Sequence, residues 1–209
     1  MNFTKRAIVA LAAWSLICIS AHWVPASAND FTNGAEKFIQ SLADDAVSTL
    51  TSKKLTETER QYKFRKLFRN YFDVDSIGKW ALGRYWRKAT KGERSEYLVL
   101  FEDLIVSTYA GRFNQYSIEK LAINGSVSRG KFAVVNSHVN SDKQKPIRVD
   151  WRVTLPDGNY KIFDIVVEGV SLVKTQRQEF SSVIRRNGGN VSGLLAALRK
   201  KTTNNTTQN

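Results

Sequence analysis

The stretch from residue 147 to residue 155 alternates strictly between apolar and polar side chains. Because successive side chains of a β-strand point to opposite faces of a sheet, this pattern predicts a strand with one buried face and one hydrated face. Such a strand restricts the fold more than any other feature, because its apolar face needs a covering layer. The apolar positions are Ile147, Val149, Trp151, Val153 and Leu155, and they alternate with Arg148, Asp150, Arg152 and Thr154.

Three further segments are rich in β-branched and aromatic residues, as strands are. Together with the first they form four consecutive runs without an intervening helical pattern. The turn sequence Pro-Asp-Gly-Asn at 156–159 joins the last two runs as a hairpin, which predicts a meandering antiparallel sheet. The four predicted strands are "SIEKLAIN" (117–124), "KFAVVNSHVN" (131–140), "PIRVDWRVTL" (146–155) and "NYKIFDIVVE" (159–168).

The segments before and after these strands have helical spacing of their apolar residues. Thr56 and Thr90 each precede a glutamate by three residues, which is the capping-box pattern at a helix start. Asp73 is a predicted cap for a short helix that stops at Gly83, and Gly188–Gly189 separates the last two helices. Helices are predicted over 35–50, from Thr56 to about Tyr71, over 74–82, over about 91–116, and over about 172–186 and 191–200.

This order of elements predicts an α+β fold. N-terminal helices, a curved four-stranded and mainly antiparallel sheet, and C-terminal helices are expected to enclose an apolar pocket between the layers. We expect a signal peptide over 1–28, a single α+β domain over 29–201 and a disordered tail over 202–209, because the tail lacks apolar residues.

The first 28 residues have the pattern of a secretory signal. Lys5 and Arg6 precede an almost wholly apolar run from Ala7 to Ala21, and Ala26-Ser27-Ala28 matches a cleavage site. Removal of this segment would take away Cys18, the sole cysteine, so neither a disulfide nor a cysteine-based metal site is expected. The sequence therefore predicts an exported protein.

The charge is strongly positive, with a formal net charge of +13. Without Lys5 and Arg6 the chain keeps 30 basic residues against 19 acidic ones, a net charge of about +11. Export argues against nucleic acid as a partner, so an anionic lipid surface or an acidic docking partner fits better. The alternative is that the basic residues form a solvated face that binds no partner.

Residues 164–173 contain the part of the sequence that most resembles a catalytic site. Gly169-x-Ser171 is most of the G-x-S-x-G turn of serine hydrolases, but the second glycine is replaced by Val173. His138, the one histidine after residue 28, precedes the serine and lies on another predicted strand, where we expect it to be hydrogen-bonded or exposed. Ser171 is therefore interpreted as a helix cap. Asp164 is either an acid–base group, the partner of a basic neighbour such as Arg148 or Arg152, or a residue at the rim of the sheet.

Two segments carry a resemblance to a known family. "FDVDSIGKWALGRYWRKAT" (72–90) and "YKIFDIVVEGVSLVKTQRQEF" (160–180) resemble the MlaC or toluene-tolerance family, and the resemblance extends over about 35–200. It implies a periplasmic, non-enzymatic phospholipid carrier in Gram-negative bacteria, without a cofactor or metal. The implied partners are an outer-membrane lipoprotein complex and an inner-membrane ABC lipid transporter, with outer-membrane lipid asymmetry as the outcome. We expect a monomer.

Alternatives are an exported binder of another envelope lipid such as a hopanoid, a small exported isomerase or hydrolase that uses Asp164 or Ser171, and an interaction module on the membrane surface. Arg84, Arg87 and Lys88 are candidates for headgroup contact or docking. From the apolar faces of the expected elements, the predicted lining of the pocket is Ile77, Trp80, Phe101, Leu104, Ile105, Tyr109, Val135, Trp151, Ile165, Val167, Val170 and Val173.

Overall fold

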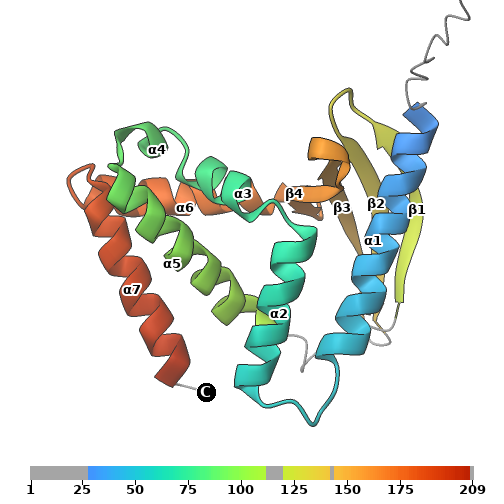
Figure 1. Ribbon diagram of the computed structural model, residues 1–209, viewed down its shortest axis with the longest axis horizontal. Coiled ribbons are helices and arrows are strands. Elements are labelled where there is room, and N and C mark those ends of the chain that lie inside the picture. The colour runs from blue at the N-terminus through green and yellow to red at the C-terminus, as the bar shows by residue number, and fades with distance from the viewer. Residues whose placement is uncertain (1–27, 112–119, 142–143, 208–209) are drawn as a thin grey trace, which may run out of the picture.

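The computed structural model describes residues 28–111, 120–141 and 144–207 of the 209-residue chain (Figure 1). The predicted signal segment therefore lies outside the described residues except for Ala28, where the first helix begins. The end of the predicted helix 91–116 and the start of the predicted strand 117–124 also lie outside them. None of the helices in the described part is long and apolar enough to cross a membrane.

Five helices precede the sheet: α1 (Ala28–Leu50), α2 (Glu57–Tyr71), α3 (Val74–Leu82), α4 (Tyr85–Lys88) and α5 (Lys91–Tyr109). Both predicted capping boxes are confirmed, because Thr56 caps α2 together with Glu59, and Thr90 caps α5 together with Glu93. The Asp73 carboxylate accepts a hydrogen bond from the Ser76 backbone at 3.2 Å and caps α3, as predicted. Gly83 ends α3 with a φ of 60°, a conformation that favours glycine.

The sheet contains β1 (Lys120–Ser128), β2 (Ala133–Ser141), β3 (Gln144–Thr154), β4 (Lys161–Val167) and β5 (Val170–Ser171). Its strand order is β1-β2-β3-β4-β5, and every neighbouring pair is antiparallel. The α+β class and the antiparallel meander are thus confirmed. The count of four strands is one too low, because residues 170–171 turn back onto β4 before the next helix begins.

The apolar side chains of the alternating stretch in β3 are buried only in the middle of the strand. Val149 and Val153 are buried and Trp151 is half-buried, whereas Ile147 and Leu155 at the ends are 38 % and 37 % exposed. The prediction of one continuous buried face was therefore wrong at both ends. Asp150, expected on the wet face, is buried, and hydrogen bonds that Arg148 and Asn136 donate to its carboxylate offset the cost of this burial.

The chain ends in two helices, α6 (Leu172–Arg186) and α7 (Val191–Thr207). The helix over 191–207 takes in most of the segment that the sequence predicts to be a disordered tail. Hydroxyl groups explain part of this difference, because Thr202 and Thr203 each donate a hydrogen bond to the Arg199 carbonyl one turn earlier.

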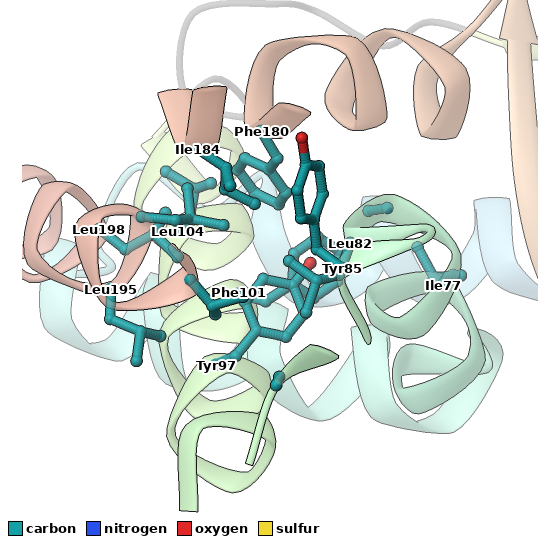
Figure 2. Close-up of a cluster of buried hydrophobic side chains, with 14 of the residues drawn as sticks. Ile77, Leu82, Tyr85, Tyr97, Phe101, Leu104, Phe180, Ile184, Leu195 and Leu198 are labelled. Carbon is teal, nitrogen blue, oxygen red and sulfur yellow. The ribbon is translucent and has the colours of Figure 1, made fainter. Parts of the chain in front are cut away.

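The apolar core is divided into two clusters. One belongs to the helices α3 to α7, and Figure 2 shows it around the rings of Tyr97, Phe101 and Phe180. Tyr97 and Phe101 each meet Phe180 edge to face, with ring centres 5.9 and 6.3 Å apart. The second cluster lies between α1 and the sheet, which α1 crosses in Figure 1. Phe72, between α2 and α3, packs against both clusters.

Candidate functional site

A cavity of about 320 Å³ lies between the two core clusters. This volume is at the lower end of the range for ligand pockets. Helices α1, α2, α3, α5 and α6 and the strands β1 to β4 all contribute to its wall. The wall consists of Ile39, Leu42, Ala43, Ala46, Leu50, Phe64, Leu67, Phe68, Phe72, Ile77, Ala81, Phe101, Ile105, Tyr109, Leu121, Val139, Trp151, Asp164, Ile165, Leu172, Val173 and Gln176.

The wall is almost entirely hydrocarbon and aromatic. Asp164 and Gln176 are its two residues with carboxylate or amide side chains. The indole nitrogen of Trp151 is already satisfied, because it donates a hydrogen bond to Ser137 at 2.9 Å. A cavity of this kind can hold an apolar chain without leaving polar groups unpaired.

Asp164 is held by three hydrogen-bond donors. Arg152 Nη1 lies 2.8 Å and Ser171 Oγ 2.7 Å from Oδ2, and the backbone nitrogen of Val173 lies 3.2 Å from Oδ1. The residue is 5 % exposed. The predicted pairing with Arg152 is confirmed, and the carboxylate ties β4 to the first turn of α6. An aspartate engaged in this way is built into the wall as a structural connection.

Ser171 caps α6, as predicted from the sequence. Its hydroxyl group donates to Asp164 and accepts from the backbone nitrogen of Lys174 at 3.1 Å. The turn before it is tight, because Gly169 has a φ of 82°. His138 is hydrogen-bonded through Nδ1 to Asn124 at 2.6 Å, on the neighbouring strand β1. Ser171 and His138 therefore do not form the nucleophile–base pair that a serine hydrolase needs.

Polar contacts tie the helical walls to each other. Tyr71 at the end of α2 donates a hydrogen bond to Asp45 of α1 at 2.6 Å, and burial together with this bond raises the pKa of Tyr71 to about 12. Arg65 and Arg69 of α2 bind the carboxylate of Glu102 on α5 at 3.0 and 2.8 Å. The hydrogen bond from Arg69 to Glu102 is the main cause of the raised pKa of Arg69. These contacts join α1, α2 and α5, which are three of the helices that enclose the cavity.

The structure brings seven of the twelve predicted lining residues to the cavity wall. Four of the other five lie in the core or on the surface. Leu104 lies in the helical cluster and Val135 in the sheet cluster, while Trp80 and Val170 are 62 % and 56 % exposed. Val167 is the half-buried last residue of β4 and does not contribute to the wall. The seven are Ile77, Phe101, Ile105, Tyr109, Trp151, Ile165 and Val173.

Sequence reasoning missed the contributions of α1 and α2. Eight wall residues belong to these helices, and the helical spacing of the apolar residues in 35–50 is the signal that could have found the first five. That spacing predicts an apolar helix face, but not the layer that the face meets. The wall residues missed in these two helices are Ile39, Leu42, Ala43, Ala46, Leu50, Phe64, Leu67 and Phe68.

The basic residues predicted to contact a headgroup or a partner lie on the surface around α4. Arg84, Arg87 and Lys88 are exposed, and none of them contributes to the cavity wall. Arg84 donates a hydrogen bond to the Tyr85 phenol at 3.1 Å, and this bond is the main cause of the lowered pKa of Tyr85. Lys88 lies over the same ring, with Nζ 5.9 Å from its centre.

The described residues contain no group of three or more histidine, cysteine or carboxylate side chains that could hold a metal ion.

A family model named "MlaC protein" matches residues 40–200. The chain belongs to this family. The intermembrane phospholipid transport system binding protein MlaC of Haemophilus influenzae is 24% identical over 159 residues, which cover 72% of this chain and 74% of that protein. The toluene tolerance protein ttg2D of Pseudomonas putida is 23% identical over 121 residues, which cover 57% of this chain and 56% of that protein.

A solved structure shares the fold. The phospholipid-binding protein of Ralstonia solanacearum, determined in complex with a phospholipid, aligns with a TM-score of 0.72 and 25% sequence identity. The alignment covers 82% of this chain and 98% of that one. The family predicted from residues 72–90 and 160–180 is thus confirmed, and so is the fold class.

Proposed function

We propose that this MlaC-family protein binds a phospholipid in the cavity between its two core clusters and carries it across the periplasm. It exchanges this lipid with an outer-membrane lipoprotein complex and with an inner-membrane ABC lipid transporter, and the outcome is the maintenance of outer-membrane lipid asymmetry. The apolar wall of the cavity is the observation that carries this proposal.

Free energies of transfer explain why such a carrier needs an apolar cavity. Two acyl chains contain on the order of 30 methylene groups, and each is worth about 0.8 kcal/mol when it is kept from water. Exposure of both chains would therefore cost roughly 24 kcal/mol, too much for unassisted crossing of an aqueous space. Side chains such as Phe101, Ile105 and Trp151 replace the contacts that the chains lose on leaving a bilayer.

Several observations support the cellular part of the proposal. The charged, apolar and small-residue pattern of 1–28 is typical of export. The relative from Haemophilus influenzae is named as part of an intermembrane phospholipid transport system, and the solved relative holds a phospholipid. Transport between membranes is the task to which an exported protein with a lipid-compatible cavity is suited.

The contacts of Asp164 and Ser171 favour carriage over catalysis. Both side chains are used to join β4 to α6, and the hydroxyl group of Ser171 has one donor and one acceptor contact inside the protein. An acid, base or nucleophile would need a free position directed at its substrate. We therefore assign both residues to the architecture of the cavity.

Analysis of the bound lipid tests the proposal directly. The protein should be purified from the periplasm without detergent, and its extracted lipids identified by mass spectrometry. About one diacyl phospholipid per chain is expected. A hopanoid as the dominant ligand would replace the phospholipid assignment by the alternative envelope lipid. Protein that carries no lipid, and takes none up from phospholipid vesicles, would contradict the proposal.

A further inference from the structure

The outward face of α6 carries a row of basic and polar side chains. Apart from the adjacent pair Arg177 and Gln178, successive members are three or four residues apart, which places them on one side of a helix. They line a surface hollow of about 330 Å³. We call this set the basic row, and it consists of Lys174, Arg177, Gln178, Ser181 and Arg185.

The positive charges of the basic row are not neutralised within the described part of the chain. None of the ion pairs there includes Lys174, Arg177 or Arg185. The acidic residue of α6, Glu179, is hydrogen-bonded to Gln176, which belongs to the cavity wall on the other side of the helix. The three positively charged side chains of the row are therefore available to bind an anionic partner.

Basic residues of α4 extend the row. The Arg177 side chain packs over the turn after α3, where a methyl group on Gly83 would come within 2.6 Å of its Nε. The positive charges of Arg84, Arg185 and Lys88 all act on the phenol of Tyr85. Arg185 at the end of the row thus lies near the basic residues that the sequence singles out. The basic row of α6 and the basic residues of α4 therefore lie close to one another.

The chemistry of this surface favours a protein partner over a bilayer. A helix that lies on a membrane normally inserts an apolar face, but the hollow on α6 is lined by lysine, arginine, glutamine and serine alone. Guanidinium groups bind carboxylates through paired hydrogen bonds, and the amide and hydroxyl groups of the row add further donors. A concave row of this composition is complementary to a chain segment rich in aspartate and glutamate.

We propose that the basic row of α6, continued by Arg84 and Lys88, is the docking surface for an acidic segment of a partner protein. The opposite side of the same helix, through Val173 and Gln176, forms part of the cavity wall. A partner on the basic row would therefore sit directly behind one wall of the cavity. That a lipid is exchanged with this partner rests on the proposed function, whereas the docking surface itself does not.

Two double variants with equal changes in charge test this proposal. Arg177→Glu/Arg185→Glu reverses the row, and Lys37→Glu/Lys66→Glu reverses two exposed lysines of α1 and α2. Each is titrated with a fluorescent oligoglutamate peptide and with vesicles of phosphatidylglycerol and phosphatidylcholine. We expect the row variant to weaken peptide binding about tenfold or more, and the control about twofold or less. Binding to the vesicles should be the same for both variants.

Equal weakening of peptide binding in the two variants would overturn the proposal, because net charge alone would then explain it. A selective loss of vesicle binding by the row variant would assign the surface to lipid instead. Thermal melts show whether each variant is folded, and Arg177→Gln/Arg185→Gln provides a milder row variant if the reversal fails to fold. Bound phospholipid is measured in parallel, so that a wild-type protein without lipid refutes the proposed function separately from the docking surface.

Discussion

Leu104 and Ile105 are neighbours on α5 that the structure places in different surroundings. Leu104 is 4 % exposed and lies inside the solid helical cluster, whereas Ile105 is half-buried and contributes to the cavity wall. Replacement of each by aspartate is the same chemical change at adjacent positions. We expect Leu104→Asp to unfold the protein, and Ile105→Asp to leave it folded but without lipid.

The magnitudes follow from the two environments. Leu104→Asp loses about 1.5–3 kcal/mol of apolar burial and forces a carboxyl group into a core without hydrogen-bond partners, at a further cost of several kcal/mol. Together these approach the total stability of about 5–15 kcal/mol that is typical of a domain. At Ile105 the carboxylate can be hydrated inside the cavity, so the loss of stability should be about 1–2 kcal/mol. An acyl chain would have to displace that water, which should weaken lipid binding about 100-fold or more.

Urea denaturation followed by circular dichroism measures the stability of both variants, and lipid extraction with mass spectrometry measures their ligand content. Ile105→Val is the matched control, because it keeps an apolar side chain at the wall and should keep its lipid. A folded Ile105→Asp protein with a wild-type amount of lipid would refute the assignment of the cavity. A Leu104→Asp protein as stable as the wild type would refute the division between core and cavity.

Three further substitutions probe the polar contacts of buried carboxylates. Glu102→Ala should lower the free energy of unfolding by about 2 kcal/mol in urea titrations, because two arginines lose their shared carboxylate. Asp164→Asn should cost about 2 kcal/mol in the same assay and loosen α6, seen as faster amide hydrogen exchange in its first turn. Burial alone would raise the pKa of Asp150, but hydrogen bonds from Arg148 and Asn136 outweigh it and hold this pKa below its ordinary value of 3.8. The resulting stability is present above that value and is lost as the pH falls through the lowered pKa, so the wild-type advantage over Asp150→Asn should shrink in acid.

Local signals in the sequence predicted much of the fold. A capping box is a pattern of two residues three positions apart, and both predicted boxes are present in the structure. The same holds for Asp73 before α3 and Ser171 before α6, because a cap is decided within one turn of the helix. The family resemblance likewise rested on contiguous segments.

The cavity wall could be predicted only in part, because it depends on contacts between distant segments. Apolar spacing in α5 identifies both Leu104 and Ile105 as inward residues, but the sequence does not show that one meets α7 and the other an open space. Trp80 illustrates the same limit. It is a large apolar residue on a short helix, yet its ring lies on the surface against Phe163, with ring centres 6.1 Å apart.

The central claim is that acyl chains occupy the space between the two core clusters. A phospholipid with a photoreactive group in its acyl chain should be loaded into the purified protein, irradiated, and its attachment sites mapped by mass spectrometry. We predict attachment to cavity residues of α1, α5 and β3, such as Ala46, Ile105 and Trp151. Attachment confined to exposed apolar residues such as Trp80 and Val170, or no attachment at all, would contradict the account.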